Sequence, residues 1–391
     1  MTKANMHRAT ALNLVENLLE KVPLIDGHND LAKVILDDQL ARGDVLTYGL
    51  NRLHLESDTD IPRLVEGKIG VQVLAAFTDS NCAKPSTRTL ELIDVIDQIK
   101  VAHADAFMPV LRADDIEEAK RQNRIGAFAA VEGGVGLENR LAPLRVWYRA
   151  GVRLMTLCHN GTLDWVDSAT DEPRSGGLSP FGRQVVAEMN RLGMMVDCAH
   201  VSADAMHDVL DVSTAPIVFS HSNARALCDH PRNVPDDVLD RLTATDGLVM
   251  ATFIPDFVSE EVRRWMVPVR NLFGTAHTGD RLSIMAAYER EHGVRPRSRI
   301  EQVADHLEYI AGRIGPDRVG IGSDFYGVSI NTIGLENVSC IKNLLVEMAC
   351  RGWGEDNLAK LAGLNFIRIF RAVEQEAERL RDTTSQQHGA V

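Results

Sequence analysis

The sequence lacks an excess of positive charge and lacks any long apolar run. Its 391 residues carry 42 Lys and Arg against 55 Asp and Glu, a formal net charge of −13. Nucleic acids and anionic membranes are bound through basic surfaces, so this balance argues against either as the main partner. No apolar stretch approaches the roughly 18 residues that indicate a membrane-spanning helix. We therefore expect a protein that acts on neither nucleic acid nor membrane.

Paired cysteine motifs are also missing. The six cysteines are isolated from one another along the chain: Cys82, Cys158, Cys198, Cys228, Cys340 and Cys350. This spacing excludes a zinc-finger pattern and a dense disulfide framework, and isolated thiols are typical of a reducing compartment. The N-terminal segment lacks the continuous apolar region of a secretory signal, and the C-terminal segment lacks a hydrophobic anchor sequence. These features predict a cytoplasmic protein.

What the sequence does contain is an alternation of short apolar segments with amphipathic ones. The strand-like segments lie at 23–26, 71–77, 125–131, 153–157, 194–198, 217–220, 248–253 and 319–323. Eight strand-plus-helix units without a break in composition predict one α/β domain over residues 1–391, a (β/α)8 TIM-like barrel with extra loops and terminal helices. A doubly wound open sheet is the structural alternative, but it gives no reason for polar residues to follow so many strands.

Four segments outside these units complete the prediction. An amphipathic helix is expected at about 5–21, and the polar tail at about 381–391 is expected to be flexible. Long connections are expected at 31–66, where the segment can cover the barrel mouth, and at 255–297, which is polar and aromatic. These segments enlarge the barrel without adding a second domain.

Seven residues of metal-binding type follow the predicted strands. They are His28 and Asp30 after the first strand, Glu132 after the third, His159 after the fourth, His200 after the fifth, His221 after the sixth and Asp324 after the eighth. In a barrel these strand ends converge on one mouth, where catalytic groups gather. Imidazoles and carboxylates together suit zinc or a similar divalent ion. If two ions bind, one carboxylate has to bridge them, and Glu132 is central in the order.

Each of these residues also has a purely structural explanation. A histidine at a strand end can be a hydrogen-bonded loop residue, and Asp324 after Gly-Ser can be a helix N-cap. Glu132 precedes two glycines and can belong to a turn. Taken singly, each residue favours the structural explanation. Seven of them at predicted strand ends favour the metal-site hypothesis.

Longer segments give the chain a resemblance to the renal (membrane) dipeptidase family of binuclear zinc peptidases, within the amidohydrolase-like barrels. The matching segments are DGHNDL at 26–31, VEGG at 131–134, LSPFGRQVVAEMNRLGMMVDCAHVS at 178–202, IVFSHSNAR at 217–225, RNVPDD at 232–237 and GIGSDF at 320–325. The resemblance implies hydrolysis of the peptide bond of dipeptides by metal-activated water, with L-D dipeptides among the candidate substrates. It also suggests a homodimer.

The resemblance implies two Zn²⁺ per chain, although the same ligands accept other divalent ions. One ion would be held by His28, Asp30 and Glu132. The bridging Glu132 would hold the other ion together with His200 and His221. These are the five metal ligands that the sequence predicts.

Three further residues receive roles from the resemblance. His159 would contact the substrate or the developing oxyanion, and Asp324 would exchange protons with the attacking water. Arg232 would pair with the terminal carboxylate of the substrate, which a planar guanidinium can grip with two hydrogen bonds. Without the resemblance, Arg232 would be interpreted as a solvated loop residue that caps the following helix.

Several positions depart from the family pattern, and they cluster around the substrate. Tyr326 stands where a second Asp is frequent, Thr162 stands where Asn is common, and Ala32 replaces a frequent Pro. Ile254 lies in a segment that lacks the tyrosines of the mammalian enzyme. An alternative function is therefore hydrolysis of a β-lactam, a lactone or an N-acyl amino acid on the same centre. A catalytically silent binding protein is a third hypothesis, although no ligand is missing.

Overall fold

Eight parallel strands form the barrel at the centre of the protein. The computed structural model describes residues 6–273 and 278–388. In spatial order the strands are β1 (Leu24–Asp26), β2 (Ile69–Phe77), β4 (Ile125–Glu132), β5 (Val152–Thr156), β6 (Met195–Asp197), β7 (Val218–Phe219), β8 (Leu248–Ala251) and β9 (Val319–Ile321). The predicted (β/α)8 fold is confirmed, and the open-sheet alternative is wrong.

The barrel closes where β9 meets β1. Gly27 N donates to Ile321 O at 2.9 Å, and Asp324 N donates to His28 O at 3.2 Å. A parallel bridge then pairs Asn29 with Phe325, just beyond the ends of both strands. The closure therefore lies at the same end of the barrel as the predicted site residues.

Side chains on both faces of the strands are buried, as expected for a parallel sheet covered by helices. Alternate residues of one strand pack into different apolar clusters: Val73 belongs to one and Leu74 to the other. Along β4, Phe128 and Val131 divide in the same way. Alternate residues thus face different clusters, and both faces are buried. Each strand therefore appears in the sequence as a short, continuously apolar run.

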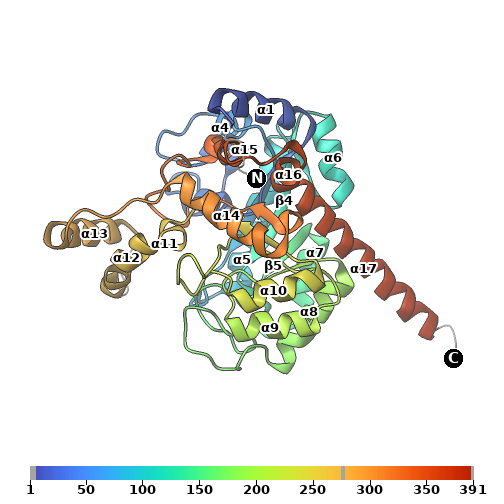
Figure 1. Ribbon diagram of the computed structural model, residues 1–391. Helices are drawn as coiled ribbons and strands as arrows, with labels where there is room; N and C mark the ends of the chain where they lie inside the picture. The colour runs from blue at the N-terminus through green and yellow to red at the C-terminus, as the bar shows by residue number, and fades with distance from the viewer. Residues whose placement is uncertain (1–5, 274–277, 389–391) are drawn as a thin grey trace.

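Helices surround the barrel (Figure 1). Those outside the 255–297 insertion are α1 (Arg8–Lys21), α2 (Leu31–Asp37), α3 (Val45–Tyr48), α4 (Ile61–Glu66), α5 (Pro85–Ala102), α6 (Ala113–Arg121), α7 (Leu141–Arg149), α8 (Pro180–Leu192), α9 (Ala203–Val212), α10 (Asp236–Thr245), α14 (Ile300–Ile314), α15 (Lys342–Cys350), α16 (Glu355–Ala359) and α17 (Asn365–His388). Side-chain caps start several of them: Ser179 accepts from Gly182 N at α8, and Ser202 accepts from Ala205 N at α9.

One strand of the sheet was not predicted. β3 (Phe107–Pro109) pairs in parallel with β4 and lies between α5 and α6 along the chain. The helix α5 stops at Ala102, and the chain reaches β3 after a short turn. Pro109 favours an extended conformation for Met108, the residue before it, as this strand requires.

The insertion after β8 is helical rather than irregular. It contains α11 (Pro255–Val258), α12 (Glu260–Phe273) and α13 (Thr278–His292), and α12 and α13 project from the barrel in Figure 1. Its small apolar cluster comprises Val262, Met266, Val269 and Met285. Pro268 lies inside α12, and proline normally argues against a helix interior. The sequence therefore predicts a loop where the structure has a helical arm.

The C-terminal segment is helical as far as the structure describes it, and the flexibility expected at about 381–391 stays a prediction. α17 continues to His388 and extends beyond the barrel (Figure 1), while 389–391 lie outside the described residues. Arg379 donates to both carboxylate oxygens of Glu376 at 2.7 Å, a pairing that supports an exposed helix. In the part of the chain that the structure describes, no helix is long and apolar enough to cross a membrane.

We predict that Gly322→Ala destabilises the barrel and Gly312→Ala does not. A Cβ on Gly322 would overlap the backbone carbonyl of Ser220, which cannot move without shifting β7. Overpacking of this kind costs about 1–3 kcal/mol or more. Gly312 lies in α14 with nothing within 4 Å of an added Cβ, so alanine there should stabilise the helix by about 0.5–1 kcal/mol. Urea denaturation of both variants measures these changes, and equal stabilities would contradict the prediction.

Candidate metal centre

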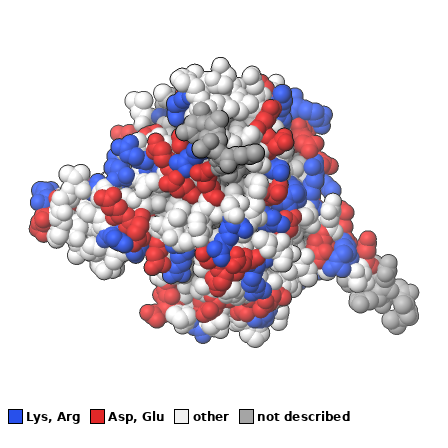
Figure 2. Space-filling model, viewed as in Figure 1, with Lys and Arg blue, Asp and Glu red and all other residues white. Residues whose placement is uncertain are grey.

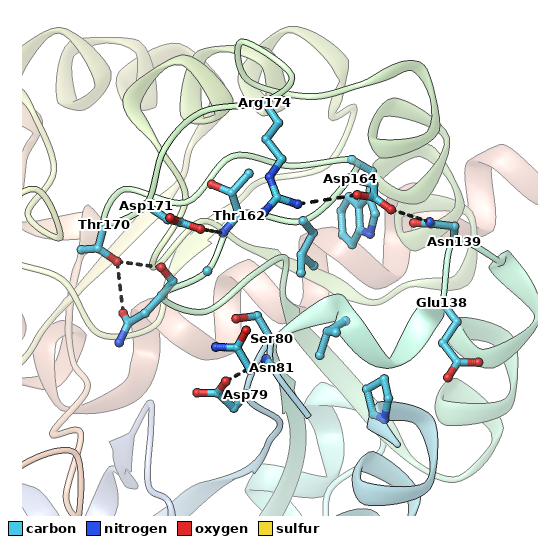
Figure 3. Close-up of a pocket in the computed structure, with 16 residues that line it drawn as sticks. Asp79, Ser80, Asn81, Glu138, Asn139, Thr162, Asp164, Thr170, Asp171 and Arg174 are labelled. Atoms are coloured by element: carbon cyan, nitrogen blue, oxygen red, sulfur yellow. Dashed lines mark hydrogen bonds and ion pairs between the residues drawn. The ribbon is translucent and has the colours of Figure 1, made fainter. Parts of the chain in front are cut away.

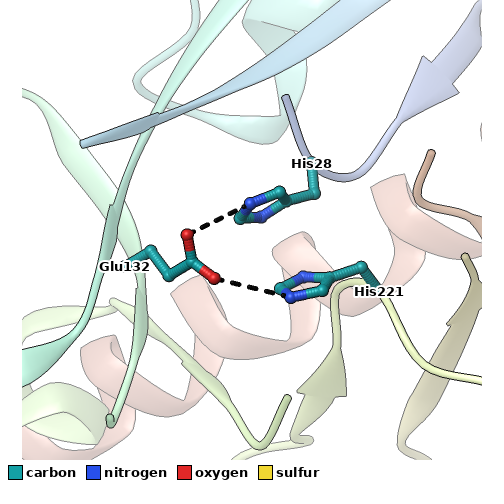
Figure 4. A group of neighbouring side chains, drawn as sticks. All are labelled: His28, Glu132 and His221. Carbon is teal, nitrogen blue, oxygen red and sulfur yellow. Dashed lines mark ion pairs between the residues drawn. The ribbon is translucent and has the colours of Figure 1, made fainter. Parts of the chain in front are cut away.

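Glu132 at the end of β4 lies between two sets of potential ligands. Its Oε2 is 3.3 Å from His28 Nε2, and its Oε1 is 2.9 Å from His200 Nε2 and 3.5 Å from His221 Nε2. Figure 4 shows the two carboxylate oxygens directed to His28 on one side and His221 on the other. The predicted central position of Glu132 is therefore reproduced in space.

The other predicted carboxylates lie on the His28 side of the centre. Asp30 Oδ1 is 3.9 Å from His28 Nε2, and Asp324 Oδ1 is 4.0 Å from the same nitrogen. On the opposite side, the Nε2 atoms of His200 and His221 are 3.0 Å apart. The barrel thus brings together residues from the ends of five different strands: β1, β4, β6, β7 and β9.

Three overlapping groups of residues can each hold a metal ion, because within each group the ligand atoms lie within 4.8 Å of one another. The groups are His28, Glu132 and His221; Glu132, His159 and His200; and His28, Asp30 and Asp324. The five predicted ligands are all represented. His159 and Asp324 also qualify by distance, although the sequence predicts other roles for them. All seven strand-end residues therefore belong to one centre.

Burial and mutual repulsion disfavour ionisation of the Asp carboxylates beside His28. Burial raises the pKa of Asp30, and burial raises the pKa of Asp324 to about 8. Burial lowers the pKa of His28, but the charges of Glu132, Asp324 and Asp30 outweigh it and raise this pKa to about 10. The negative charge that favours a proton on His28 also favours a divalent cation at this position.

The histidines on the other side are neutral imidazoles. Burial lowers the pKa of both His200 and His221 well below the usual value, and the charge of Arg232 contributes to both shifts. Burial opposes the ionisation of Glu132, but His28 and His200 outweigh it and hold the pKa of Glu132 well below its usual range. An ionised carboxylate beside neutral imidazoles is the form in which these side chains bind metals.

Hydrogen bonds at the far nitrogens fix which atom each imidazole presents to the centre. Ser220 Oγ donates to Asp197 Oδ2 at 2.6 Å, so it accepts from His221 Nδ1 at 2.7 Å. Asn160 Oδ1, 3.1 Å from His200 Nδ1, is likewise an acceptor. Each ring therefore carries its proton on Nδ1 and directs the lone pair of Nε2 at Glu132, as in metal-binding histidines.

Two buried aspartates support the loops that carry His221 and Asp324, and neither aspartate was predicted from the sequence to have this role. Asp197 accepts from Ser220 N, Ser220 Oγ and Thr156 Oγ1, which joins β5, β6 and the end of β7. Asp26 accepts from the backbone and hydroxyl of Ser323, both at 2.7 Å, and joins β1 to β9. Both are the last residue of an apolar strand shortly before a predicted ligand, a signal that could have identified them.

Backbone strain marks two of the site residues. His200 has φ 74° and Asp324 has φ 63°, in the left-handed region that non-glycine residues rarely adopt. Such residues persist where the surrounding structure holds them, and they concentrate at functional sites. Asp324 is followed by a turn rather than by a helix. Its interpretation as a helix N-cap is therefore wrong.

His159 forms a wall of the centre. Its ring lies 4.4 Å from the Phe77 ring and 4.3 Å from the His200 ring, measured between centroids. Burial lowers the pKa of His159 to about 4, so the imidazole is neutral at physiological pH. A neutral imidazole in this place can donate one hydrogen bond to a bound ligand.

Arg232 is buried without a partner. Its relative exposure is 1%, and none of its three guanidinium nitrogens has a hydrogen-bond partner among the described residues. Its guanidinium carbon lies 5.4 Å from the centre of the Phe257 ring. The interpretation as a solvated capping residue is therefore wrong. A buried cation of this kind calls for an anion, and its electrostatic effect on His200 and His221 shows that it adjoins the centre.

A cavity of about 610 Å³ opens at the loop that follows β5 (Figure 3). None of the seven strand-end residues lines it. Asn160, which bonds His200, forms part of its wall, and so does Thr162, one of the positions that depart from the family pattern. Asp171 Oδ2 accepts from Thr162 N at 2.9 Å, and Arg174 pairs with Asp164 across the rim. Asn160 therefore connects the wall of this cavity to the metal centre.

Charges of both signs are mixed on the visible surface (Figure 2). Lys and Arg side chains alternate with Asp and Glu, and this face shows no continuous basic patch. On this face, therefore, no surface of one sign is present of the kind that binds a nucleic acid backbone.

The residues of the centre fit divalent metal ions. His28 Nε2 and Asp30 Oδ1 are buried and have no hydrogen-bond partner among the described residues. Buried polar atoms are normally satisfied, and a cation between these two atoms would satisfy both. The donor set of imidazole nitrogens and carboxylate oxygens is the one that zinc prefers at catalytic sites.

The fold and the site define a class, an α/β barrel hydrolase with imidazoles and carboxylates at the carboxyl ends of its strands. The family model described as membrane dipeptidase (peptidase family M19) matches residues 12–384. Because the match covers nearly the whole chain, the protein belongs to this family of peptidases. The predicted resemblance is confirmed.

Relatives with similar sequences are dipeptidases by name. Dipeptidase tcpJ of Claviceps purpurea is 34% identical over 406 residues, covering 94% of this chain and 86% of that protein. An uncharacterized dipeptidase of Schizosaccharomyces pombe is 35% identical over 373 residues, covering 91% of this chain and 82% of that protein. The similarity therefore extends over most of both chains in each comparison.

Solved structures share the fold. The probable dipeptidase PvdM from Pseudomonas aeruginosa has a TM-score of 0.82 at 23% identity, covering 95% of this chain and 100% of that one. A metallo peptidase from Rhodobacter sphaeroides, liganded with a phosphinate mimic of the dipeptide L-Ala-D-Ala, has a TM-score of 0.73 at 22% identity. That comparison covers 90% of this chain and 99% of the other. At these identities the comparisons establish the common barrel.

We predict that Ser220→Ala weakens metal binding through His221. The substitution removes the hydroxyl that accepts from His221 Nδ1 and donates to Asp197, so the imidazole loses its fixed orientation. Loss of such a partner typically costs 10–100-fold in metal affinity. Zinc competition with a chromophoric chelator measures the change. Ser222→Ala is the control, because Ser222 Oγ is buried without a hydrogen-bond partner; equal affinities in the two variants would contradict the prediction.

Proposed function

We propose that this protein is a dipeptidase that binds two Zn²⁺ and hydrolyses the peptide bond of dipeptides. The observation that carries the proposal is the position of Glu132, whose two oxygens face His28 on one side and His200 and His221 on the other. Membership of the dipeptidase family supports the substrate class. The proposal includes the cytoplasmic location and the homodimer that the sequence analysis predicts. All six cysteines are free, which agrees with a reducing compartment.

The proposed ligands divide into two sets that share Glu132. His28, Asp30 and Glu132 would hold one ion, and Glu132, His200 and His221 would hold the other. Bound there, the two ions would supply Lewis acidity, which activates water as a nucleophile and polarises a substrate carbonyl. The protein contributes preorganisation, because Asp197 and Asn160 orient the imidazoles before any ligand binds.

Asp324 is the proposed proton carrier. Its carboxylate is buried beside His28, and burial raises its pKa to about 8, so it can hold a proton near neutral pH. A group with a pKa near the working pH can take a proton from the attacking water and return it to the leaving amine. The neighbouring Gly327 leaves room for the carboxylate, because a Cβ there would lie 2.6 Å from Asp324 Oδ1.

Arg232 and His159 are the proposed substrate contacts. The unpartnered guanidinium of Arg232 can accept the terminal carboxylate in a bidentate pair. The neutral ring of His159 can donate to the oxygen on which negative charge develops, a contact that stabilises the transition state more than the ground state.

The two other hypotheses have less support. Nothing in the described residues specifically favours a β-lactam, a lactone or an N-acyl amino acid over a dipeptide. A silent binding protein would be expected to lack a ligand, whereas all five predicted ligands converge. Dipeptide hydrolysis is therefore the function that the geometry supports best.

We predict that the purified protein holds two zinc ions per chain and releases amino acids from a panel of L-L and L-D dipeptides. Asp324→Asn should keep both ions and lose activity about 10²–10⁴-fold, because the amide preserves the shape and cannot carry the proton. Metal analysis and a ninhydrin assay measure the two quantities. Asp164→Asn, on the 72% exposed side chain at the cavity rim, is the control. A parent that hydrolyses no dipeptide would disprove the proposed function.

We predict that Arg232→Met weakens substrate binding without lowering the stability of the protein. The substitution preserves volume and removes a buried, unpaired charge, so the free energy of unfolding should rise or stay unchanged. KM should rise about 100-fold or more for dipeptides with a free carboxylate, since a charge-assisted bidentate contact is lost. A C-terminally amidated dipeptide provides the comparison. If the variant loses as much activity on the amide as on the free acid, Arg232 does not bind the carboxylate.

A further inference from the structure

The loops that carry the site residues of β1 and β9 run side by side. Asp324 N donates to His28 O at 3.2 Å, and Asp30 N donates to Phe325 O at 3.3 Å. The first loop carries two of the proposed ligands and the second carries the proposed proton carrier. The separation of these groups is therefore set by how firmly the two loops are held together.

Tyr326 connects the second loop to a distant segment of the chain. Thr59 N donates to the Tyr326 hydroxyl at 2.8 Å, and the same hydroxyl lies 2.6 Å from Ser57 Oγ and 3.2 Å from Thr59 O. Ser57 Oγ in turn donates to Thr59 O at 3.1 Å. The hydroxyl is therefore occupied on both its donor and acceptor sides by residues 57–59.

Thr59 also holds the first loop. Asn29 Nδ2 donates to Thr59 Oγ1 at 2.9 Å, and Asn29 Oδ1 accepts from Leu31 N at 3.0 Å. Asn29 lies between His28 and Asp30, and both Asn29 and Thr59 are fully buried. A closed circuit of contacts thus runs from the Asp324 loop through Tyr326 and Thr59 to the loop of His28 and Asp30.

The Asp324 loop requires such an anchor, because its backbone is strained. Asp324 has φ 63° and Tyr326 has φ 73°, two non-glycine residues in the left-handed region within three positions. Each costs of the order of 1–3 kcal/mol and persists only where other contacts determine the conformation. The Tyr326 hydroxyl supplies such contacts, because its partners Ser57 and Thr59 lie outside the loop.

We propose that Tyr326 is a positioning residue, whose hydroxyl fixes the Asp324 loop to the His28 loop through Thr59. The inference rests on the proposed function for its catalytic consequence. Among the described residues, the hydrogen bonds of the Tyr326 hydroxyl go to Ser57 and Thr59, and none goes to Arg232 or to a proposed ligand. It acts by holding the carboxylate of Asp324 at its place beside His28, and small displacements of reacting groups cost up to about 10²-fold in rate.

The test compares Tyr326→Phe with Tyr48→Phe. Tyr48 is buried, and its hydroxyl lies 3.5 Å from the same Ser57 Oγ, but no hydrogen bond among the described residues joins it to the Asp324 loop. Tyr326→Phe should lower kcat about 10–100-fold and change KM less than about threefold, because Arg232 is untouched. Tyr48→Phe should leave both constants within about twofold. Circular dichroism and thermal unfolding of the metal-loaded protein establish that both variants fold.

Hydrogen exchange gives a readout that does not depend on activity. In the metal-loaded protein without substrate, Tyr326→Phe should accelerate exchange in peptides that cover 27–31 and 322–327. These peptides contain the amides of Asp30 and Asp324, which bridge the two loops. Tyr48→Phe should not accelerate exchange in either peptide.

Thr59→Val tests the circuit from the other side. The substitution removes the hydroxyl that accepts from Asn29 and leaves the backbone contact with Tyr326 intact. It should lower kcat in the same way, and the double variant with Tyr326→Phe should be no slower than the slower single variant, because coupled residues are non-additive.

Unchanged kcat and unchanged exchange in Tyr326→Phe would overturn the inference, as would strictly additive losses in the double variant. A loss of stability without a change in kcat or in local exchange would show a merely structural role and overturn it as well. If the parent protein hydrolyses no dipeptide, the proposed function fails, and the exchange experiment still decides whether Tyr326 joins the loops.

Discussion

The buried carboxylate of Glu132 is the constraint on which the rest of the structure depends. It lies 3% exposed at the end of β4, the strand that pairs with β2 over seven positions, and no lysine or arginine of the described residues forms an ion pair with it. A buried charge of this kind needs compensation, and here the surrounding imidazoles and any bound cation must supply it. Because His28, His200 and His221 follow different strands, the compensation exists only when the barrel has closed. The centre therefore exists only in the folded barrel.

The residues that close the barrel also orient the ligands. Asp26 joins β1 to β9 through Ser323 and lies two residues before His28. Asp197 joins β5 and the end of β7 through Thr156 and Ser220, and the same Ser220 hydroxyl holds His221. Each aspartate satisfies backbone or hydroxyl donors at the end of a short strand, where ladder hydrogen bonds run out. Stability at the barrel mouth and preorganisation of the site consequently depend on the same few carboxylates.

Much of this arrangement could be predicted from the sequence, since a parallel strand is a short apolar run and its polar successor lies at the barrel mouth. The seven strand-end residues follow from that rule, and Arg232 follows from the family resemblance. Asp26 and Asp197 escaped prediction because they bind neighbouring strands rather than the centre, and the pairing of Asp26 with Ser323 joins residues 297 positions apart. α12 escaped because of Pro268. The contact of Tyr326 with Thr59 spans 267 residues, and no local pattern predicts pairing at that distance.

The departures from the family pattern are not equivalent once their surroundings are known. The Tyr326 hydroxyl is occupied by Ser57 and Thr59, so its replacement of an acidic residue concerns loop geometry rather than substrate contact. Ile254 is 3% exposed and precedes α11, where it serves packing. Thr162 alone of these three lines the cavity at the loop that follows β5. The three positions therefore differ in what they do in the structure: Tyr326 anchors a loop, Ile254 packs in the interior, and Thr162 forms part of a cavity wall.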